Sequence, residues 1–235
     1  MPGLPKHVKI FPMKTAKGKV EEIFLDGSAR ISCPPELIPA PGQYLHAQTA
    51  GSDSALAVSL FPSLPTPTGF CSAPPIPSEW LPGRELHLRG PIGRGFTLPL
   101  SARKVALVAF DDSFSRLLGL VSQALNQHAE IVAICDRPIE GLPEIVEIQR
   151  LKSMPEILLW ADYAAVDVGR ENLNRVVKSL AGSEQTAARI EAQVLVRSPM
   201  PCAGIAECGV CALASRHDWR MICKDGPVFN LGEWI

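Results

Sequence analysis

Hydrophobic and polar positions alternate along the first hundred residues with the two-residue period of β-strands. Residues 84–89, Arg-Glu-Leu-His-Leu-Arg, show this alternation plainly, and Gly27 marks a turn between the first two runs. The pattern predicts a β-barrel domain over residues 1–100. The predicted strands cover residues 20–25, 29–33, 44–48 and 84–89, and residues 55–61 form a further apolar run.

A proline-rich stretch interrupts this domain. Residues 62–82 contain seven prolines, at positions 62, 65, 67, 74, 75, 77 and 82. Because proline has no backbone N–H to donate to a neighbouring strand, this composition predicts an irregular loop and argues against a central strand.

A glycine-rich segment, Gly90-Pro-Ile-Gly-Arg-Gly-Phe, follows the last predicted strand of the barrel. It predicts a tight turn. Gly90, Gly93 and Gly95 are candidates for a nest of backbone amides that binds an anionic cofactor group. A turn between two domains accounts for the same glycines equally well.

The period of the pattern changes near residue 101, where short apolar runs begin to alternate with amphipathic segments. Such alternation predicts a parallel sheet with helices on its faces, a nucleotide-type α/β domain over residues 101–198. Asp112 or Ser113 is expected to cap the first helix. The predicted strands cover 104–110, 130–135, 144–148, 164–168 and 192–197, and the predicted helices cover 113–127, 155–160 and 171–181.

Composition and charge exclude some classes of function. Hydrophobic residues make up 46% of the chain, charged residues 20%, and the net charge is −1. Such a chain has no basic field to hold a nucleic acid. No apolar run approaches the roughly 20 residues of a membrane span, and the first residues lack a secretory signal. We therefore expect a cytoplasmic protein without a nucleic-acid partner.

Seven cysteines are present, and four of them fall within the last segment, residues 199–235. Without an export signal, such a cluster indicates metal binding rather than disulfides. The spacing is C-x5-C-x2-C-x11-C. The four candidate metal ligands are Cys202, Cys208, Cys211 and Cys223, whereas the cysteines at 33, 71 and 135 are isolated.

The spacing of the four cysteines favours a [2Fe-2S] cluster. Plant-type loops use a similar spacing with a first gap one residue shorter, and Gly204 and Gly209 would let backbone amides approach the sulfur atoms. A zinc site with four cysteine ligands is the main alternative, although a zinc ribbon usually has two C-x2-C pairs and this chain has one. Unligated thiols are a further alternative. His217 could replace one ligand, but a solvated loop histidine explains it as well.

Three further segments carry a resemblance to a known family. They are Pro41-Gly-Gln-Tyr, Leu88-Arg-Gly-Pro-Ile-Gly-Arg-Gly-Phe and Cys223-Lys-Asp-Gly-Pro-Val-Phe. In these segments, in the cysteine loop and in the order of its elements, nearly the whole chain resembles the electron-transfer subunit of type B dihydroorotate dehydrogenases, within the ferredoxin-reductase superfamily.

This resemblance implies a barrel that binds FAD, a nucleotide domain that accepts NAD and a C-terminal [2Fe-2S] cluster. It also implies a catalytic partner subunit that carries FMN and oxidises dihydroorotate to orotate. Electrons would pass from the partner's flavin through the cluster to FAD and then NAD. The four clustered cysteines match the family's cluster ligands, apart from the longer first gap.

Two cofactor motifs of the family are missing. The barrel strand that should carry Arg-Pro for the FAD pyrophosphate reads Ala57-Val-Ser-Leu-Phe-Pro, without a cation. The turn after the first strand of the second domain has no glycine, and Asp111 and Asp112 place negative charge where a pyrophosphate would bind. Asp136 is read as a turn residue. The sequence therefore argues against NAD and leaves FAD a candidate cofactor without its usual motif.

The leading hypothesis is an oxidoreductase component rather than a stand-alone enzyme. It would relay electrons through its cluster between a partner flavoprotein, or another redox partner, and an acceptor. A complete flavoprotein is one alternative. A zinc-bearing structural or regulatory module on a degenerate reductase fold is the other. The motifs assemble no Ser-His-Asp or Cys-His nucleophile set.

Overall fold

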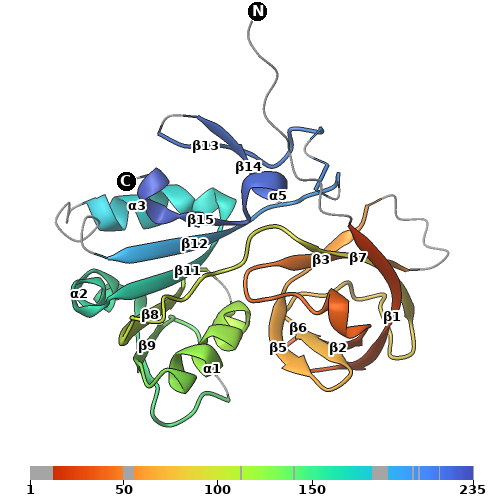
Figure 1. Ribbon diagram of the computed structural model, residues 1–235, viewed down its shortest axis with the longest axis horizontal. Coiled ribbons are helices and arrows are strands. Elements are labelled where there is room, and N and C mark those ends of the chain that lie inside the picture. The colour runs from red at the N-terminus through yellow and green to blue at the C-terminus, as the bar shows by residue number, and fades with distance from the viewer. Residues whose placement is uncertain are drawn as a thin grey trace, which may run out of the picture.

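The described residues form two large sheets, one from each half of the chain, and a small two-stranded sheet within the cysteine segment, which folds across the junction of the large sheets (Figure 1). Asp112 and His217 lie outside the described residues. The computed structural model describes residues 13–49, 56–111, 113–139, 141–181, 190–202, 204–205, 207–216 and 218–234.

The first sheet is antiparallel, has seven strands and curls into a barrel-like domain, as the alternation of residues predicted. One face of each strand packs into a core that includes Ile31, Leu45, Phe70 and Leu88, all essentially inaccessible to solvent. In spatial order the strands are β4 (Val58–Leu60), β3 (Tyr44–Thr49), β7 (Glu85–Ile92), β1 (Lys14–Ile23), β2 (Ala29–Ser32), β6 (Gly69–Ser72) and β5 (Pro62–Thr66), and the 3-10 helix η1 covers Pro35–Leu37.

Two predictions for this domain were wrong. The proline-rich stretch was expected to be a loop, but its first part forms β5 and β6. β5 can contain prolines because it is an edge strand, in which the backbone N–H groups on the outer side have no neighbouring strand to bond. β6 contains no proline. The turn expected from Gly90 begins later, because Gly90 lies within β7 with a φ of 147°.

The second sheet has the predicted parallel strands, with one antiparallel strand added by the cysteine segment. Its spatial order is β10 (Glu147–Gln149), β9 (Glu130–Ile134), β8 (Lys104–Ala109), β11 (Tyr163–Gly169), β12 (Glu191–Arg197) and β15 (Val228–Asn230). The sequence did not predict β15. The central strands are buried on both faces, which explains their nearly continuous apolar runs.

Helices cover both faces of this sheet. Val105 and Leu107 of β8 face α1 (Leu118–Asn126), whereas Ala106 and Val108 face the side of α2 (Met154–Trp160) and α3 (Leu173–Ala181). Short 3-10 turns precede these helices: η2 (Phe114–Leu117), η3 (Leu151–Ser153) and η4 (Arg170–Asn172). None of the helices in the described part of the chain is long and apolar enough to cross a membrane.

The two domains meet closely at α1. A Cβ atom added to Gly119 of α1 would lie 2.8 Å from the side chain of Pro41 and 3.3 Å from the carbonyl oxygen of Ser63, both in the barrel domain. Only a glycine lets the helix backbone approach the barrel so closely. The two domains are therefore in close contact at this point.

Candidate metal centre

The cysteine segment is attached to both domains. β15 pairs with β12 of the second sheet, and the amide of Arg94, directly after the barrel, donates to the carbonyl of Gly226 at 2.7 Å. A Cβ atom at Gly93 would lie 2.4 Å from Pro227, so this approach requires glycine. The segment also contains β13 (Ala212–Ala214), β14 (Trp219–Met221), α5 (Ile222–Asp225) and η5 (Leu231–Glu233).

Three of the four candidate ligands gather at this junction. Cys211 and Cys223 are buried and Cys202 is half-buried, whereas Cys208 is exposed. The sulfur atoms of Cys202 and Cys223 lie 4.0 Å apart, and the amide of Cys223 donates to the sulfur of Cys211 at 3.4 Å. Within the described residues, no group of three or more His, Cys, Asp or Glu side chains already has the geometry of a bound metal.

The chemistry of these thiols fits a metal or cluster. Burial, together with the neighbouring thiols of Cys211 and Cys202, raises the pKa of Cys223 above its usual value. A thiolate is therefore costly here unless a cation compensates its charge, as a bound metal would. The backbone supports the same reading, because Gly204 and Gly209 adopt positive φ angles of 83° and 69° on the loop between the cysteines.

A buried polar atom beside the thiols also lacks a partner. The hydroxyl of Tyr44 is buried and makes no hydrogen bond within the described part of the chain. A Cβ atom added to Gly204 would lie 3.8 Å from that hydroxyl oxygen and 3.6 Å from the carbonyl oxygen of Cys223. The site therefore presents a donor without an acceptor, which fits an anionic group such as an iron–sulfur cluster.

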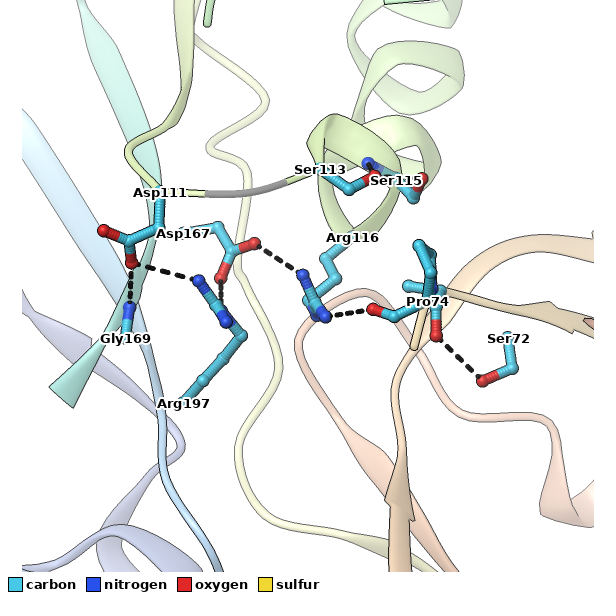
Figure 2. A network of polar contacts seen from close by, with 10 residues as sticks. Ser72, Pro74, Asp111, Ser113, Ser115, Arg116, Asp167, Gly169 and Arg197 are labelled. Atoms are coloured by element: carbon cyan, nitrogen blue, oxygen red, sulfur yellow. Dashed lines mark hydrogen bonds and ion pairs between the residues drawn. The ribbon is translucent and has the colours of Figure 1, made fainter. Parts of the chain in front are cut away.

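A network of ion pairs lies at the strand ends of the second domain (Figure 2). Asp167 on β11 accepts from Arg197 Nε at 2.8 Å and from Arg116 Nη1 at 3.3 Å. Arg197 also pairs with Asp111 at 3.0 Å. Arg116 donates in turn to the carbonyl of Pro74 in the barrel domain, so one network spans both domains.

The position of this ion-pair network in the sheet shows whether a dinucleotide could bind there. In open α/β sheets a dinucleotide binds beyond the carboxyl ends of the strands, where the strand order reverses. Here the reversal lies between β8 and β11, and the network is built at the ends of β8, β11 and β12. The residues present do not fit an NAD site, because ion-paired side chains, buried at Arg116 and Asp167, lie at the strand ends where a dinucleotide would bind.

The predicted polar residues of this region have structural roles. Asp111 was expected to place charge at the helix N-terminus, but it accepts instead from the backbone of Gly169 and from Asn172 at 2.7 Å. Ser113 caps η2 as predicted, by accepting from the amide of Ser115. Asp136 accepts from the amide of Leu151 at 3.0 Å, which supports its reading as a turn residue.

The sequence reading missed Arg116, Asp167 and Arg197. The available signal was Asp167 itself, an ionisable residue within an otherwise apolar predicted strand. Lys and Asp residues are almost never fully buried without a partner, so such an aspartate indicates a buried cation elsewhere. The sequence could not indicate which arginines supply it.

The barrel also lacks the family's FAD cradle. Phe61 directly precedes Pro62, where the Arg-Pro motif would place its arginine. Its buried ring lies 5.6 Å from the ring of Tyr44, and the guanidinium of Arg116 lies 6.0 Å from it. These residues do not fit the family's FAD pyrophosphate site, since the cation present is already held by Asp167.

The glycine-rich segment, residues 90–96, connects the two domains. The amides of Arg94 and Phe96 donate to the carbonyls of Gly226 and Pro41 at 2.7 and 2.9 Å. A Cβ atom at Gly95 would lie 2.7 Å from that Pro41 carbonyl. The contacts account for two of the glycines by close packing, and the anion nest at Gly90, Gly93 and Gly95 stays a prediction.

Comparison with known proteins agrees with the cysteine site. Residues 199–234 match the family model described as the iron–sulfur cluster binding domain of dihydroorotate dehydrogenase B. The cofactor of this segment is an iron–sulfur cluster. This match confirms the prediction of an iron–sulfur cluster rather than zinc, and it does not test the individual ligands.

A curated relative extends the similarity beyond the cysteine segment. The chain is 26% identical over 178 residues to the electron-transfer subunit of dihydroorotate dehydrogenase B (NAD(+)) from Desulforamulus reducens. The alignment covers 65% of this chain and 66% of that protein, so the chain spans about two thirds of the relative's length. The resemblance stated from the sequence motifs is confirmed.

Solved structures show the fold. The chain is similar to a structure of NADH-dependent reduced ferredoxin–NADP oxidoreductase, with a TM-score of 0.73, 14% identity and coverage of 93% of this chain and 89% of that one. A ferredoxin reductase of carbazole 1,9a-dioxygenase gives a TM-score of 0.59 at 14% identity, covering 78% and 68%. The fold is therefore ferredoxin-reductase-like, as predicted.

Proposed function

We propose that this chain is the iron–sulfur electron-transfer subunit of a larger oxidoreductase, in which Cys202, Cys208, Cys211 and Cys223 hold a [2Fe-2S] cluster. Its units are a barrel domain over residues 1–100, an α/β domain over 101–198 and the cluster segment over 199–235. One observation carries the proposal: the thiols of Cys202, Cys211 and Cys223 gather at the domain junction, while ion-paired side chains lie at the strand ends where a dinucleotide would bind.

When bound, the cluster supplies one-electron transfer at the surface of the chain. The protein's own residues prepare the site for it. Burial of Cys211 and Cys223 excludes water from one side, and the amide of Cys223 directs its hydrogen at the sulfur of Cys211. Such amide donors stabilise negative charge on the sulfur and raise the potential of the cluster.

A partner flavoprotein would exchange electrons on the side of Cys208. That cysteine is exposed, and large apolar side chains near it in the segment are exposed as well. The similarity to the Desulforamulus protein supports an FMN-containing, dihydroorotate dehydrogenase-like catalytic subunit as that partner. The apolar side chains are Ile205, Val210 and Trp219.

We place the subunit in the cytoplasm. None of the seven cysteines forms a disulfide in the described part of the chain, which suits a reducing compartment better than an oxidising one. A cluster held by thiolates needs the same condition, because oxidation of its ligands to disulfides would release the iron.

The iron, sulfide, zinc and flavin contents of the purified protein test the proposal. Anaerobic purification should yield a coloured protein with iron and sulfide in equal amounts, in the ratio of a [2Fe-2S] cluster, and an EPR signal after reduction. Flavin should be far below one per chain. A colourless protein with one zinc per chain would instead support the structural or regulatory module, and bound flavin would support the complete flavoprotein.

A further inference from the structure

Tyr44 places an unused hydrogen-bond donor beside the cysteine site. It is the first residue of β3, and its side chain is fully buried. Its hydroxyl is one of few buried polar side-chain atoms in the described part of the chain that have no hydrogen-bond partner. Buried hydroxyls normally find an acceptor, because an unpaired one has lost its water without compensation.

The surroundings of the ring fix where the hydroxyl points. The rings of His46 and Phe61 pack against Tyr44 with centroids 5.3 and 5.6 Å away. At the hydroxyl end lies the cysteine loop, where a Cβ atom on Gly204 would come within 3.8 Å of the oxygen. The phenol is therefore held between the barrel core and the thiols by packing on both sides.

The same three thiols are near enough to the phenol to act on its pKa. Burial, followed by the charges of Cys223, Cys211 and Cys202, raises the pKa of Tyr44 above its usual value. A phenol is a hydrogen-bond donor in its ordinary neutral form, so this hydroxyl can donate to a sulfur atom beside it. Sulfur atoms of an iron–sulfur cluster would be the acceptors that this donor lacks.

We propose that Tyr44 is a positioning residue for the cluster, which donates its hydroxyl hydrogen to a cluster sulfur atom and raises the reduction potential. The inference rests on the proposed function, because it requires the cluster. Reduction adds one electron to the cluster and increases its negative charge. A donor aimed at sulfur therefore stabilises the reduced state more than the oxidised state.

The chain offers a matched control. Tyr163 is the second of its two tyrosines and is also fully buried, but its hydroxyl donates to Gln193 Oε1 at 2.8 Å in the other sheet. Tyr44→Phe and Tyr163→Phe each remove one buried hydroxyl oxygen and nothing else. Only the first change should alter the cluster.

The test is an anaerobic redox titration of the whole chain followed by EPR, with iron and sulfide content measured on the same samples. Tyr44→Phe should hold the cluster at a lower midpoint potential, whereas Tyr163→Phe should keep the wild-type potential. A Tyr44→Phe protein with full cluster content and the wild-type potential overturns the inference, as does an equal shift in Tyr163→Phe.

A second measurement covers the case in which Tyr44→Phe does not fold or loses the cluster. In the Tyr163→Phe background, 3-fluorotyrosine would enter only at position 44. The fluorinated phenol is a stronger donor of nearly the same size, so the potential should rise, and an unchanged potential overturns the inference. A wild-type chain without any cluster overturns the proposed function as well, which separates the two failures.

Discussion

Asp167 and Arg116 form an ion pair of 3.3 Å whose side chains are both buried, at the edge of the sheet where related folds bind dinucleotides. Through Arg116 the pair reaches the backbone of Pro74 in the barrel domain (Figure 2). The charged side chains at this edge of the sheet thus make a contact between the two domains.

Removal of Asp167 should strongly destabilise the protein. Asp167→Ala leaves two buried or half-buried guanidinium groups, on Arg116 and Arg197, without their shared carboxylate. We expect a loss of about 3–5 kcal/mol in the free energy of unfolding, measured by urea denaturation. Lys17→Ala is the control, because it breaks an exposed ion pair with Glu85 and should cost less than about 1 kcal/mol. Similar losses for both variants would contradict a structural role for the buried network.

Nicotinamide dinucleotides should not bind the isolated chain. A ligand present at 100 times its dissociation constant stabilises a protein by about 2.7 kcal/mol, which is readily seen as a rise in melting temperature. Because Arg116, Asp167 and Arg197 pair with one another at the strand ends, neither NAD nor NADH should change the melting temperature at millimolar concentration. A saturable rise with either nucleotide would show that the network opens.

Each clustered cysteine should be needed for the cluster. Cys208→Ser and Cys223→Ser are expected to reduce iron and sulfide content to a small fraction of the wild-type value, because each removes one of the four proposed thiolate ligands. Cys71→Ser is the control, since Cys71 lies on β6 of the barrel domain and should leave the cluster intact. Retention of the full cluster in Cys208→Ser would point to another fourth ligand.

Low pH should reduce the folding stability of the barrel domain because of His46. Burial, together with the charge of Arg89, lowers the pKa of His46 from 6.5 to about 4. Between these values the unfolded chain binds more protons than the folded one, so stability falls as the pH falls from 6.5 towards 4. At pH 5 this contribution amounts to about 2 kcal/mol relative to neutral pH.

Replacement of His46 by a side chain that does not titrate should remove this loss of stability at low pH. His46→Gln retains an amide that can reach Ser59, which His46 Nε2 contacts at 3.2 Å. Urea denaturation at pH 7 and pH 5 should therefore show a smaller pH effect in His46→Gln than in the wild type. His87→Gln, at an exposed position on β7, should leave the wild-type pH effect unchanged. An equal effect in all three proteins would assign the acid sensitivity to other groups.

Much of the architecture follows from local patterns. The two-residue period of the first hundred residues and the alternation of strands and helices after residue 101 are properties of neighbouring positions, and the structure shows both sheets. The proline rule failed at Pro62 and Pro65 because it depends on whether a strand is central or at an edge. The position in the sheet is set by partners distant in sequence.

The cysteine spacing and the missing glycine and arginine motifs were legible in the sequence alone, because ligand loops and phosphate turns are short segments. The ion pairs at the strand ends of the second domain could not be predicted from the sequence. Arg197 and Asp111 are 86 positions apart, and only the parallel sheet brings their strand ends together. Likewise, the barrel and the cysteine segment must pack before the hydroxyl of Tyr44 lies beside the thiols. The sequence by itself thus determined the elements and the candidate ligands, and the tertiary structure decided which charges and donors surround them, because burial and pairing depend on contacts between distant residues.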